Sequence, residues 1–304
     1  MKVAAIIVTY NGKDYIRKCL SSLYENSIVS SIIIVDNLST DNTVDILKNH
    51  FPNVIVIISE SNIGFGKANN KGIVRALQDG ADYVFLINQD AYVEREGISN
   101  LVEIFEKNKQ YGIIAPVQLN GTGDNIDIKF YDYLFNQNKE IGYRLYNQEK
   151  SGVYPVAFVN AAAWLISREC IEKVGGFDPI FFHTGEDDDY AQRVKYWQYK
   201  IGIAPSVHVR HDRPQVAWSS SAPTVKREVT LNILGLKNIH DSLSRNFKKL
   251  FRKKFFYIFY SLITFNVKKL KLDITALSLS LKMIPVIKES RKISYRKFAF
   301  LDGY

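Results

Sequence analysis

The 304-residue sequence predicts an α/β fold with a mostly parallel, doubly wound sheet and a helical C-terminal extension. Short β-branched runs alternate with amphipathic segments near the N-terminus, as in strand-helix-strand units. Beyond about Pro223 this pattern stops, and basic, aromatic helical segments follow. The composition, 46% hydrophobic and 23% charged, is that of a globular chain with a sizeable core.

The strands and helices are expected in alternation. Four runs rich in Val and Ile are typical of strands buried on both faces: Val3–Val8, Ile32–Val35, Val54–Ile58 and Tyr83–Ile87. Apolar residues at helical spacing predict helices within Asp14–Asn26, Ser39–Asn49 and Gly66–Leu77. Ser39, Thr40 and Asp41 are candidate N-caps of the second helix. Residues 118–155 are polar and poorly periodic, which predicts an irregular excursion beside a site.

The net charge of +9 is unevenly distributed. Residues 226–304 carry 18 Lys and Arg against 5 Asp and Glu, which leaves 22 against 26 for residues 1–225. We therefore expect a catalytic domain at 1–225 and a basic, aromatic-rich helical region at 226–304, the second facing an anionic partner.

The sequence gives no sign of an integral membrane protein. The N-terminal apolar run Val3–Val8 is too short for a signal peptide or a span, and Phe255–Phe265 has about half the length needed to cross a bilayer. Two cysteines are too few for a disulfide scaffold and fit a reducing compartment.

Polar side chains follow three of the predicted strands. They are Thr9-Tyr10-Asn11, Asp36-Asn37 and Asn88-Gln89-Asp90. Ligands of open α/β sheets bind beyond the carboxyl ends of the strands, so the three groups together favour a site over simple turn and cap formation. Lys67, in the Gly-rich segment before the third helix, could meet a phosphate at a helix N-terminus.

These residues and two later motifs resemble the family 2 glycosyltransferases, inverting enzymes of GT-A fold that use nucleotide-activated sugars. The motifs occur in family order over roughly residues 1–215: Val8-Thr9-Tyr10-Asn11, Val35–Asp41, Asn62–Gly72, Asn88-Gln89-Asp90-Ala91, and Gly175-Gly176-Phe177-Asp178 leading into Gly185-Glu186-Asp187. The Gln89-Asp90 pair resembles the Gln-Asp pair that the rhamnosyltransferase branch of the family carries at the equivalent place.

The resemblance implies roles for individual residues. Thr9 and Asp36 would contact the base and ribose of the donor, and Lys67 would lie near the nucleotide. Asp90 would be the last residue of the family's D-x-D metal motif, whose first position is Asn88 here. Asn88 could bond a ribose hydroxyl but is a weak partner for a cation.

A metal site is expected to include a histidine. His211 resembles the late histidine that contacts metal or diphosphate in relatives, whereas His208 should point to the opposite side of an extended segment. A simple hydrogen-bonded histidine on a strand edge is the alternative. The expected cofactor is Mg²⁺ or Mn²⁺, with the imidazole favouring Mn²⁺.

The acidic run Glu186–Asp189 is expected to supply the base. The motif points to Asp187 as the base that deprotonates the acceptor hydroxyl, with Glu186 orienting the acceptor and Asp188 or Asp189 facing solvent. An acidic first helical turn without chemistry is the alternative. Trp164 is a candidate for stacking on a sugar, with a place in the core as the competing interpretation, and His183 is a candidate wall on the acceptor side.

The basic C-terminal region contains an amphipathic helix. Apolar residues recur at three- and four-residue steps from Phe247 to Leu262, with Lys248, Lys249, Arg252 and Lys253 between them. This pattern favours docking on an anionic membrane, on its cytoplasmic face, over packing of the aromatic stripe on the catalytic domain or in a homodimer. The sequence contains no recognised nucleic-acid module.

The expected function is therefore inverting transfer of a sugar from a nucleotide-diphosphate donor to a saccharide acceptor, lipid-linked, in surface polysaccharide synthesis. L-rhamnose from a dTDP donor is favoured, and a UDP-hexose is the main competitor. Two other classes remain as alternatives. One is a nucleotidyltransferase, although this sequence lacks the basic phosphate loop that such an enzyme has after its first strand. The other is an inactive carbohydrate- or membrane-binding homologue.

Overall fold

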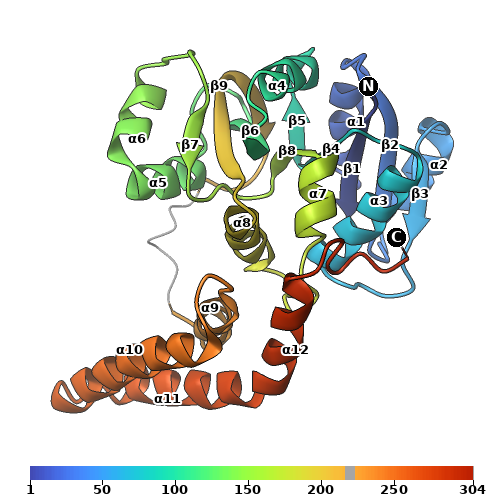
Figure 1. Ribbon diagram of the computed structural model, residues 1–304. Coiled ribbons are helices and arrows are strands. Elements are labelled where there is room, and N and C mark those ends of the chain that lie inside the picture. Colours follow the sequence, from blue (N-terminus) through green and yellow to red (C-terminus); the bar gives the residue numbers. More distant parts are fainter. Residues whose placement is uncertain (216–222, 304) are drawn as a thin grey trace.

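A mixed sheet with helices on both faces forms the body of the protein (Figure 1). The computed structural model describes residues 1–215 and 223–303, and within them the sheet has nine strands. Eight follow the order β3-β2-β1-β4-β8-β6-β9-β5, and β7 pairs with β9. Their bounds are β1 Val3–Thr9, β2 Val29–Asp36, β3 Ile55–Ile58, β4 Tyr83–Asn88, β5 Ala91–Val93, β6 Tyr111–Asn120, β7 Tyr154–Val156, β8 Ala163–Ser167 and β9 Lys200–His211.

The N-terminal half of the sheet is parallel, as predicted. β1 pairs in parallel with both β2 and β4, and β2 pairs with β3. Helices α1 (Ile16–Tyr24), α2 (Thr43–His50) and α3 (Phe65–Gln78) make the return connections. Successive residues of β1 enter opposite cores, Ile6 on one side and Ile7 on the other, which explains the continuous apolar runs.

The second half of the sheet is not mostly parallel. β8 lies antiparallel between β4 and β6, and both β5 and β7 are antiparallel to β9, while β6 and β9 are parallel. The expectation of a mostly parallel sheet is wrong for this half, because a short apolar run shows burial but not strand direction. The remaining helices of the body are α4 (Gly97–Glu106), α7 (Arg168–Val174) and α8 (Glu186–Tyr196).

The segment 118–155 contains two helices and not only irregular chain. Helix α5 (Ile128–Gln137) begins after Asp127, which accepts a hydrogen bond from the backbone of Phe130, and α6 (Lys139–Tyr146) begins after Asn138. Their buried side chains include Phe130, Leu134, Ile141 and Leu145. Apolar residues four positions apart within each short helix were the sequence signal for these two helices.

Four helices form the C-terminal region over the described residues 223–303. They are α9 (Val225–Lys237), α10 (Leu243–Ile263), α11 (Val267–Lys282) and α12 (Ile284–Ser294). Helix α10 confirms the amphipathic helix predicted from Phe247, and α10 and α11 form a hairpin that projects beyond the body (Figure 1). No helix in the described part of the chain is long and apolar enough to cross a bilayer.

Buried ion pairs attach these helices to the body and to each other. The Lys237 ammonium of α9 pairs with Asp178 and, at 3.1 Å, with Asp189 of α8. Lys254 of α10 pairs with Asp273 of α11 at 2.7 Å and with Glu228 of α9 at 2.7 Å. After α12 the chain returns to α3, where Asn70 donates to the carbonyl of Phe300 at 3.0 Å.

Candidate active site

A cavity of about 690 Å³ lies where the end of β4, the N-terminal turn of α8 and helix α5 meet. Asn88 lines it from β4, and Tyr133 lines it from α5. His183, Glu186 and Asp187 line it from the loop and first turn of α8. The cavity therefore brings together one strand-end residue and both acids that the sequence singles out for catalysis.

The backbone before α8 aims the acids at this cavity. Thr184 and Gly185 both have positive φ, 77° and 95°, so the chain turns sharply and the helix begins at Glu186. A Cβ at Gly185 would lie 2.8 Å from Thr230 and 2.9 Å from Phe181, so a side chain does not fit. The acids occupy the first turn, where the helix dipole stabilises negative charge.

Burial and mutual repulsion raise the proton affinity of these acids. Burial, assisted by the charge of Asp187, raises the pKa of Glu186 to about 7. Burial also raises the pKa of Asp187, although hydrogen bonds from the backbones of Asp188 and Ala161 and the nearby His183 oppose it. The pKa of Asp188 rises to about 7 through burial and its acidic neighbours.

A general base at Asp187 predicts an activity that rises with pH. Only the ionised carboxylate accepts a proton, so kcat/KM should fall on the acid side of neutrality as this group of acids becomes protonated. Rates measured across the pH range would check this, and a kcat/KM that stays constant from acid to neutral pH would contradict it.

Asp189 does not face solvent, which corrects one expectation for the acidic run. Its carboxylate is buried and pairs with Arg193 at 2.8 Å and with Lys237 at 3.1 Å. These two cations outweigh its burial and lower the pKa of Asp189. Lys237 lies 48 residues further along the chain, and the sequence pattern gave no sign that it would reach α8.

The first two strand-end groups are organised around Asp36. Its carboxylate accepts hydrogen bonds from the Thr9 hydroxyl at 2.9 Å and from the hydroxyl and backbone of Ser39. Thr9 and Asp36 are both completely buried, and their contact with the donor stays a prediction. They hold the two strand ends together beneath the exposed side chains of Tyr10 and Leu38.

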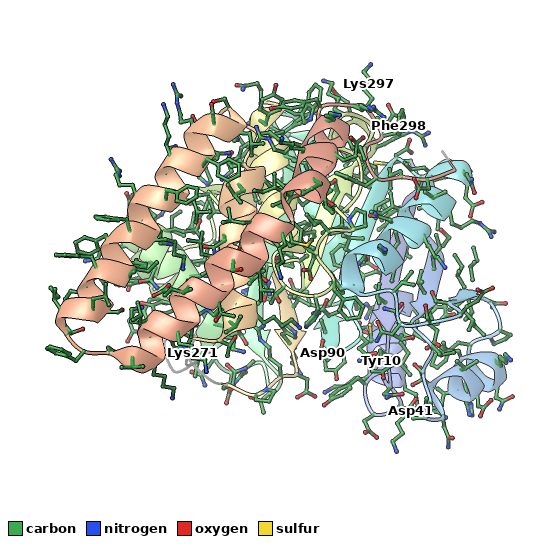
Figure 2. The ribbon with its side chains drawn as sticks, turned by 90° about the horizontal axis from the view of Figure 1, so that it is seen from below. Tyr10, Asp41, Asp90, Lys271, Lys297 and Phe298 are labelled. Atoms are coloured by element: carbon green, nitrogen blue, oxygen red, sulfur yellow. The ribbon has the colours of Figure 1, made fainter. Side chains whose placement is uncertain are left out.

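Asp90 and His211 lie side by side beyond β4. The Asp90 Oδ1 and His211 Nε2 atoms are 3.4 Å apart, and Ala91 pairs with His211 between strands β5 and β9. His208 faces elsewhere and contacts Glu94 at 3.4 Å, which confirms that the two histidines point in opposite directions. Figure 2 shows Asp90 close to the end of β1, near Tyr10.

Two buried polar atoms at this edge have no partner in the described part of the chain. One is Asn88 Oδ1 and the other is Nδ1 of His211. A buried polar atom without a hydrogen bond costs free energy, and such atoms are typical of sites that a ligand completes. Within residues 1–215 and 223–303 no three His, Cys, Asp or Glu side chains converge on one point, so the role of Asp90 and His211 as metal ligands stays a prediction.

Neither Trp164 nor Lys67 is among the residues that line the active-site cavity, and the contact of Lys67 with the nucleotide stays a prediction. Trp164 is completely buried and stacks on Phe177 at 6.0 Å, so it belongs to the core and does not contact a sugar. Lys67 lines a separate groove with Lys71 and the C-terminal segment around Lys297, because that segment folds back along α3. His183 is exposed and lines the active-site cavity, as expected.

Sequence reasoning missed a polar group on the α5 side of the cavity. Arg213 lines the cavity and its Nε atom donates to Asp127, the N-cap of α5, at 3.0 Å. Gln118 donates to Asn160 at 2.7 Å, and the Tyr133 hydroxyl bonds the same amide oxygen. The position of Arg213, two residues after His211, was the only local signal.

Comparison with known proteins adds family and fold. Residues 4–175 match the family described as Glycosyl transferase family 2. The O-antigen chain rhamnosyltransferase WbaN of Salmonella anatum is 28% identical over 183 residues, which are 60% of this chain and 56% of that protein. The dTDP-rhamnosyl transferase RfbF of Shigella flexneri is 24% identical over 214 residues, covering 69% and 68% of the two chains.

Solved structures with the same fold are more distant in sequence. The mannosyltransferase PcManGT of Pyrobaculum calidifontis, in complex with GDP-Man and Mn²⁺, has a TM-score of 0.55 and 20% identity, covering 92% of this chain and 75% of that one. Residues 1–349 of S. aureus TarS in complex with UDP give a TM-score of 0.54 at 15% identity, covering 81% and 68%. These similarities confirm the GT-A fold with a helical C-terminal region.

Proposed function

Because the chain belongs to glycosyl transferase family 2, we propose that it transfers a sugar from a nucleotide diphosphate to a saccharide hydroxyl with inversion at the anomeric carbon. The observation that carries this proposal is the shared cavity of Asp187, Glu186 and Asn88. It offers a base for the acceptor beside the strand end where the donor is expected.

The proposed donor is dTDP-L-rhamnose. WbaN and RfbF are rhamnosyltransferases by name, and so is the N-acetylglucosaminyl-diphospho-decaprenol L-rhamnosyltransferase of Mycobacterium tuberculosis, 23% identical over 231 residues. The Gln89-Asp90 pair at the end of β4 supports the same branch. A UDP-hexose remains the competing donor.

Some residues of the site would act on the acceptor, and others would bind the donor. Asp187 would take the proton of the acceptor hydroxyl as that oxygen attacks the anomeric carbon, and the bond from this carbon to the donor diphosphate would break. Glu186, with a pKa of about 7, would hydrogen-bond the acceptor. The Oδ1 atom of Asn88, buried without a partner among the described residues, would accept a hydrogen bond from a donor hydroxyl.

Asp90 and His211 would hold a divalent cation, Mg²⁺ or Mn²⁺. Their Oδ1 and Nε2 atoms, 3.4 Å apart, are close enough to share one ion, and substrate phosphates commonly supply the other ligands of such ions. When bound, the cation would neutralise charge on the departing diphosphate. Carboxylate and imidazole together favour Mn²⁺ somewhat over Mg²⁺.

Release of the nucleotide tests the reaction and the donor together. The purified chain with Mn²⁺ should release nucleoside diphosphate slowly by hydrolysis from dTDP-L-rhamnose, and more slowly from UDP-glucose or UDP-galactose. Faster release from a UDP-sugar would replace the proposed donor. No release from any nucleotide sugar, with or without saccharide acceptors, would contradict the transferase itself.

We also propose a lipid-linked acceptor, in surface polysaccharide synthesis, and peripheral docking of the α10–α11 hairpin on an anionic membrane. Phe255 is 73% exposed and Phe265 is 89% exposed, and Phe256, Phe259 and Ile263 of the same hairpin are also exposed. Exposed aromatic residues in this number are unusual on a monomer surface.

Cationic side chains accompany the exposed aromatics of the hairpin. Lys248, Arg252 and Lys253 lie on α10, and Lys268 and Lys271 lie on α11 (Figure 2 labels Lys271). Each Lys or Arg near an anionic lipid surface contributes about 1 kcal/mol of binding free energy, and buried aromatic side chains add to it. The buried pairing of Lys254 with Asp273 keeps the two helices of the hairpin together.

Vesicle flotation tests this docking. The wild-type chain should bind phosphatidylglycerol vesicles, and the triple variant Phe255→Ser, Phe256→Ser, Phe259→Ser should bind at least about tenfold more weakly, since each buried aromatic side chain contributes more than 1 kcal/mol. Tyr24→Ser on α1, exposed but distant from the hairpin, serves as control. Equal binding of the wild type and the triple variant would refute the docking.

A further inference from the structure

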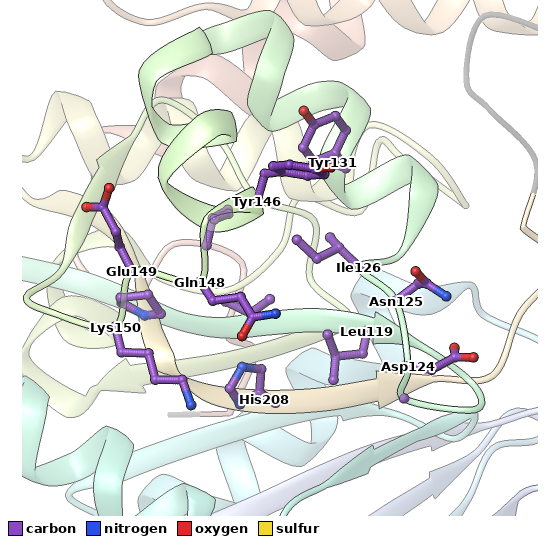
Figure 3. A pocket seen from close by; sticks show the side chains of 14 residues that line it. Leu119, Asp124, Asn125, Ile126, Tyr131, Tyr146, Gln148, Glu149, Lys150 and His208 are labelled. Atoms are coloured by element: carbon purple, nitrogen blue, oxygen red, sulfur yellow. The ribbon is translucent and has the colours of Figure 1, made fainter.

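A second cavity, of about 770 Å³, lies on the side of α5 away from the active site. Strands β6 and β9 form its floor, and the turn 123–126 and the chain leaving α6 form its walls. Figure 3 shows the side chains of Gln148, Ile126 and His208 converging on this space. We call it the α6 groove; its volume is in the range of ligand pockets.

Helix α5 is the partition between this groove and the active site. Lys129, Tyr133 and Asn136 line the active-site cavity, whereas Tyr131 lines the groove. This division follows the helical repeat, since positions four and seven residues apart share a face. An α-helix with its side chains is about 10–12 Å across, so the two cavities are about one helix diameter apart.

Three polar side chains that line the groove form no hydrogen bond with the described part of the chain. The Gln148 amide, the Tyr146 hydroxyl and the Tyr131 hydroxyl have no such bond in residues 1–215 and 223–303. Tyr146 is 73% exposed. Gln148 has φ of 56° just after α6, a left-handed position that usually holds Gly or Asn, so a glutamine there has a conformational cost.

The chemistry of these groups matches an uncharged sugar. A tyrosine ring offers an apolar face for the C–H side of a pyranose, and a primary amide donates and accepts hydrogen bonds with neighbouring hydroxyls. Ile126 suits an apolar substituent. The charged residues that line the groove are Asp124, Glu149 and Lys150, so acids outnumber lysines there and the groove does not favour a phosphate.

We propose that the α6 groove binds sugars of the acceptor chain that lie behind the residue carrying the reacting hydroxyl. This inference rests on the proposed function, since only a saccharide acceptor gives the groove its ligand. The acceptor end enters the cavity of Asp187, and its preceding sugars pass α5 and contact Tyr146 and Gln148. The groove thereby selects acceptors by length and by the identity of their inner sugars.

Saturation-transfer NMR with the full chain tests this site without requiring turnover. The probes are a rhamnose disaccharide and trisaccharide, maltotriose and chitotriose. At least one trisaccharide should bind the wild type, and Tyr146→Ala and Gln148→Ala should each weaken its binding about tenfold. Tyr143→Ala is the matched control, because Tyr143 is 57% exposed on the same helix and does not line the groove.

The outcomes separate this inference from the proposed function. Binding that survives Asp187→Asn but is weakened by the two groove variants supports it. Absence of binding by every trisaccharide, or binding that the groove variants leave unchanged, overturns it. Release of nucleoside diphosphate from the donor, measured in parallel, reports the transferase reaction alone, so a groove that fails while donor turnover persists removes only this inference.

Discussion

The Asp187→Asn variant is expected to lose sugar transfer almost completely, with kcat lowered by about 10²–10⁴-fold. Asparagine keeps the size of the side chain and one oxygen that accepts from the neighbouring backbone, but it cannot take a proton from the acceptor. Since the proposed role of Asp187 is toward the acceptor, the affinity for the nucleotide donor should change little. Transfer kinetics with titration calorimetry of the nucleotide would measure both quantities.

Asp188→Asn is the matched control for this loss. Asp188 lies on the same helical turn, lines the same cavity and also has a raised pKa, of about 7. The motif nevertheless assigns it no proton transfer, and its replacement should change kcat by only a few-fold. If Asp187→Asn kept more than a tenth of the activity, or if Asp188→Asn were equally inactive, the assignment of the base would be wrong.

The Lys237→Met variant is expected to lower the free energy of unfolding by about 3–5 kcal/mol. The ammonium of Lys237 is buried between Asp178 and Asp189 and donates to Ser290 at 2.8 Å. Its removal leaves the buried carboxylate of Asp178 without its cation partner, and leaves Asp189 paired with Arg193. Denaturant unfolding followed by circular dichroism would measure the loss.

The same network predicts that the C-terminal helices and the body unfold together. Lys237 belongs to α9 and Ser290 to α12, whereas Asp189 belongs to α8 of the body. We therefore propose that the boundary near residue 225 separates regions of different composition and not independently stable units. Lys249→Met, at an exposed pair with Asp241, should leave stability nearly unchanged. A small loss for Lys237→Met, or two separate transitions, would contradict this account.

The sequence patterns predict the first half of the fold better than the second. The strands of the N-terminal half are continuous apolar runs and their helices have regular spacing, so local pattern decides the structure there. Strand β8 is an equally apolar run, but its antiparallel place between β4 and β6 depends on the path of 118–155. That path includes two short helices whose stability comes from contacts with the body.

The location of a candidate site residue can be predicted from sequence when its position along a helix or strand decides where its side chain lies. Asp187 and Glu186 face the cavity because the turn at Thr184 and Gly185 places the start of α8 there. Asp36 matches the motif, but a motif does not show that hydrogen bonds from Thr9 and Ser39 bury its carboxylate. Long-range packing against Phe177 places Trp164 in the core, and the returning C-terminal segment shares a groove with Lys67; local sequence pattern shows neither contact.

The central claim is that the nucleotide sugar binds at the end of β4, between Asp90 and Asp187. A crystal structure of the chain with dTDP-L-rhamnose, or with UDP-glucose if that donor turns over, would test it most directly. We expect the diphosphate beside Asp90 and His211 and the anomeric carbon turned toward Asp187. A nucleotide seated in the groove of Lys67 and Lys297, away from both carboxylates, would contradict the account.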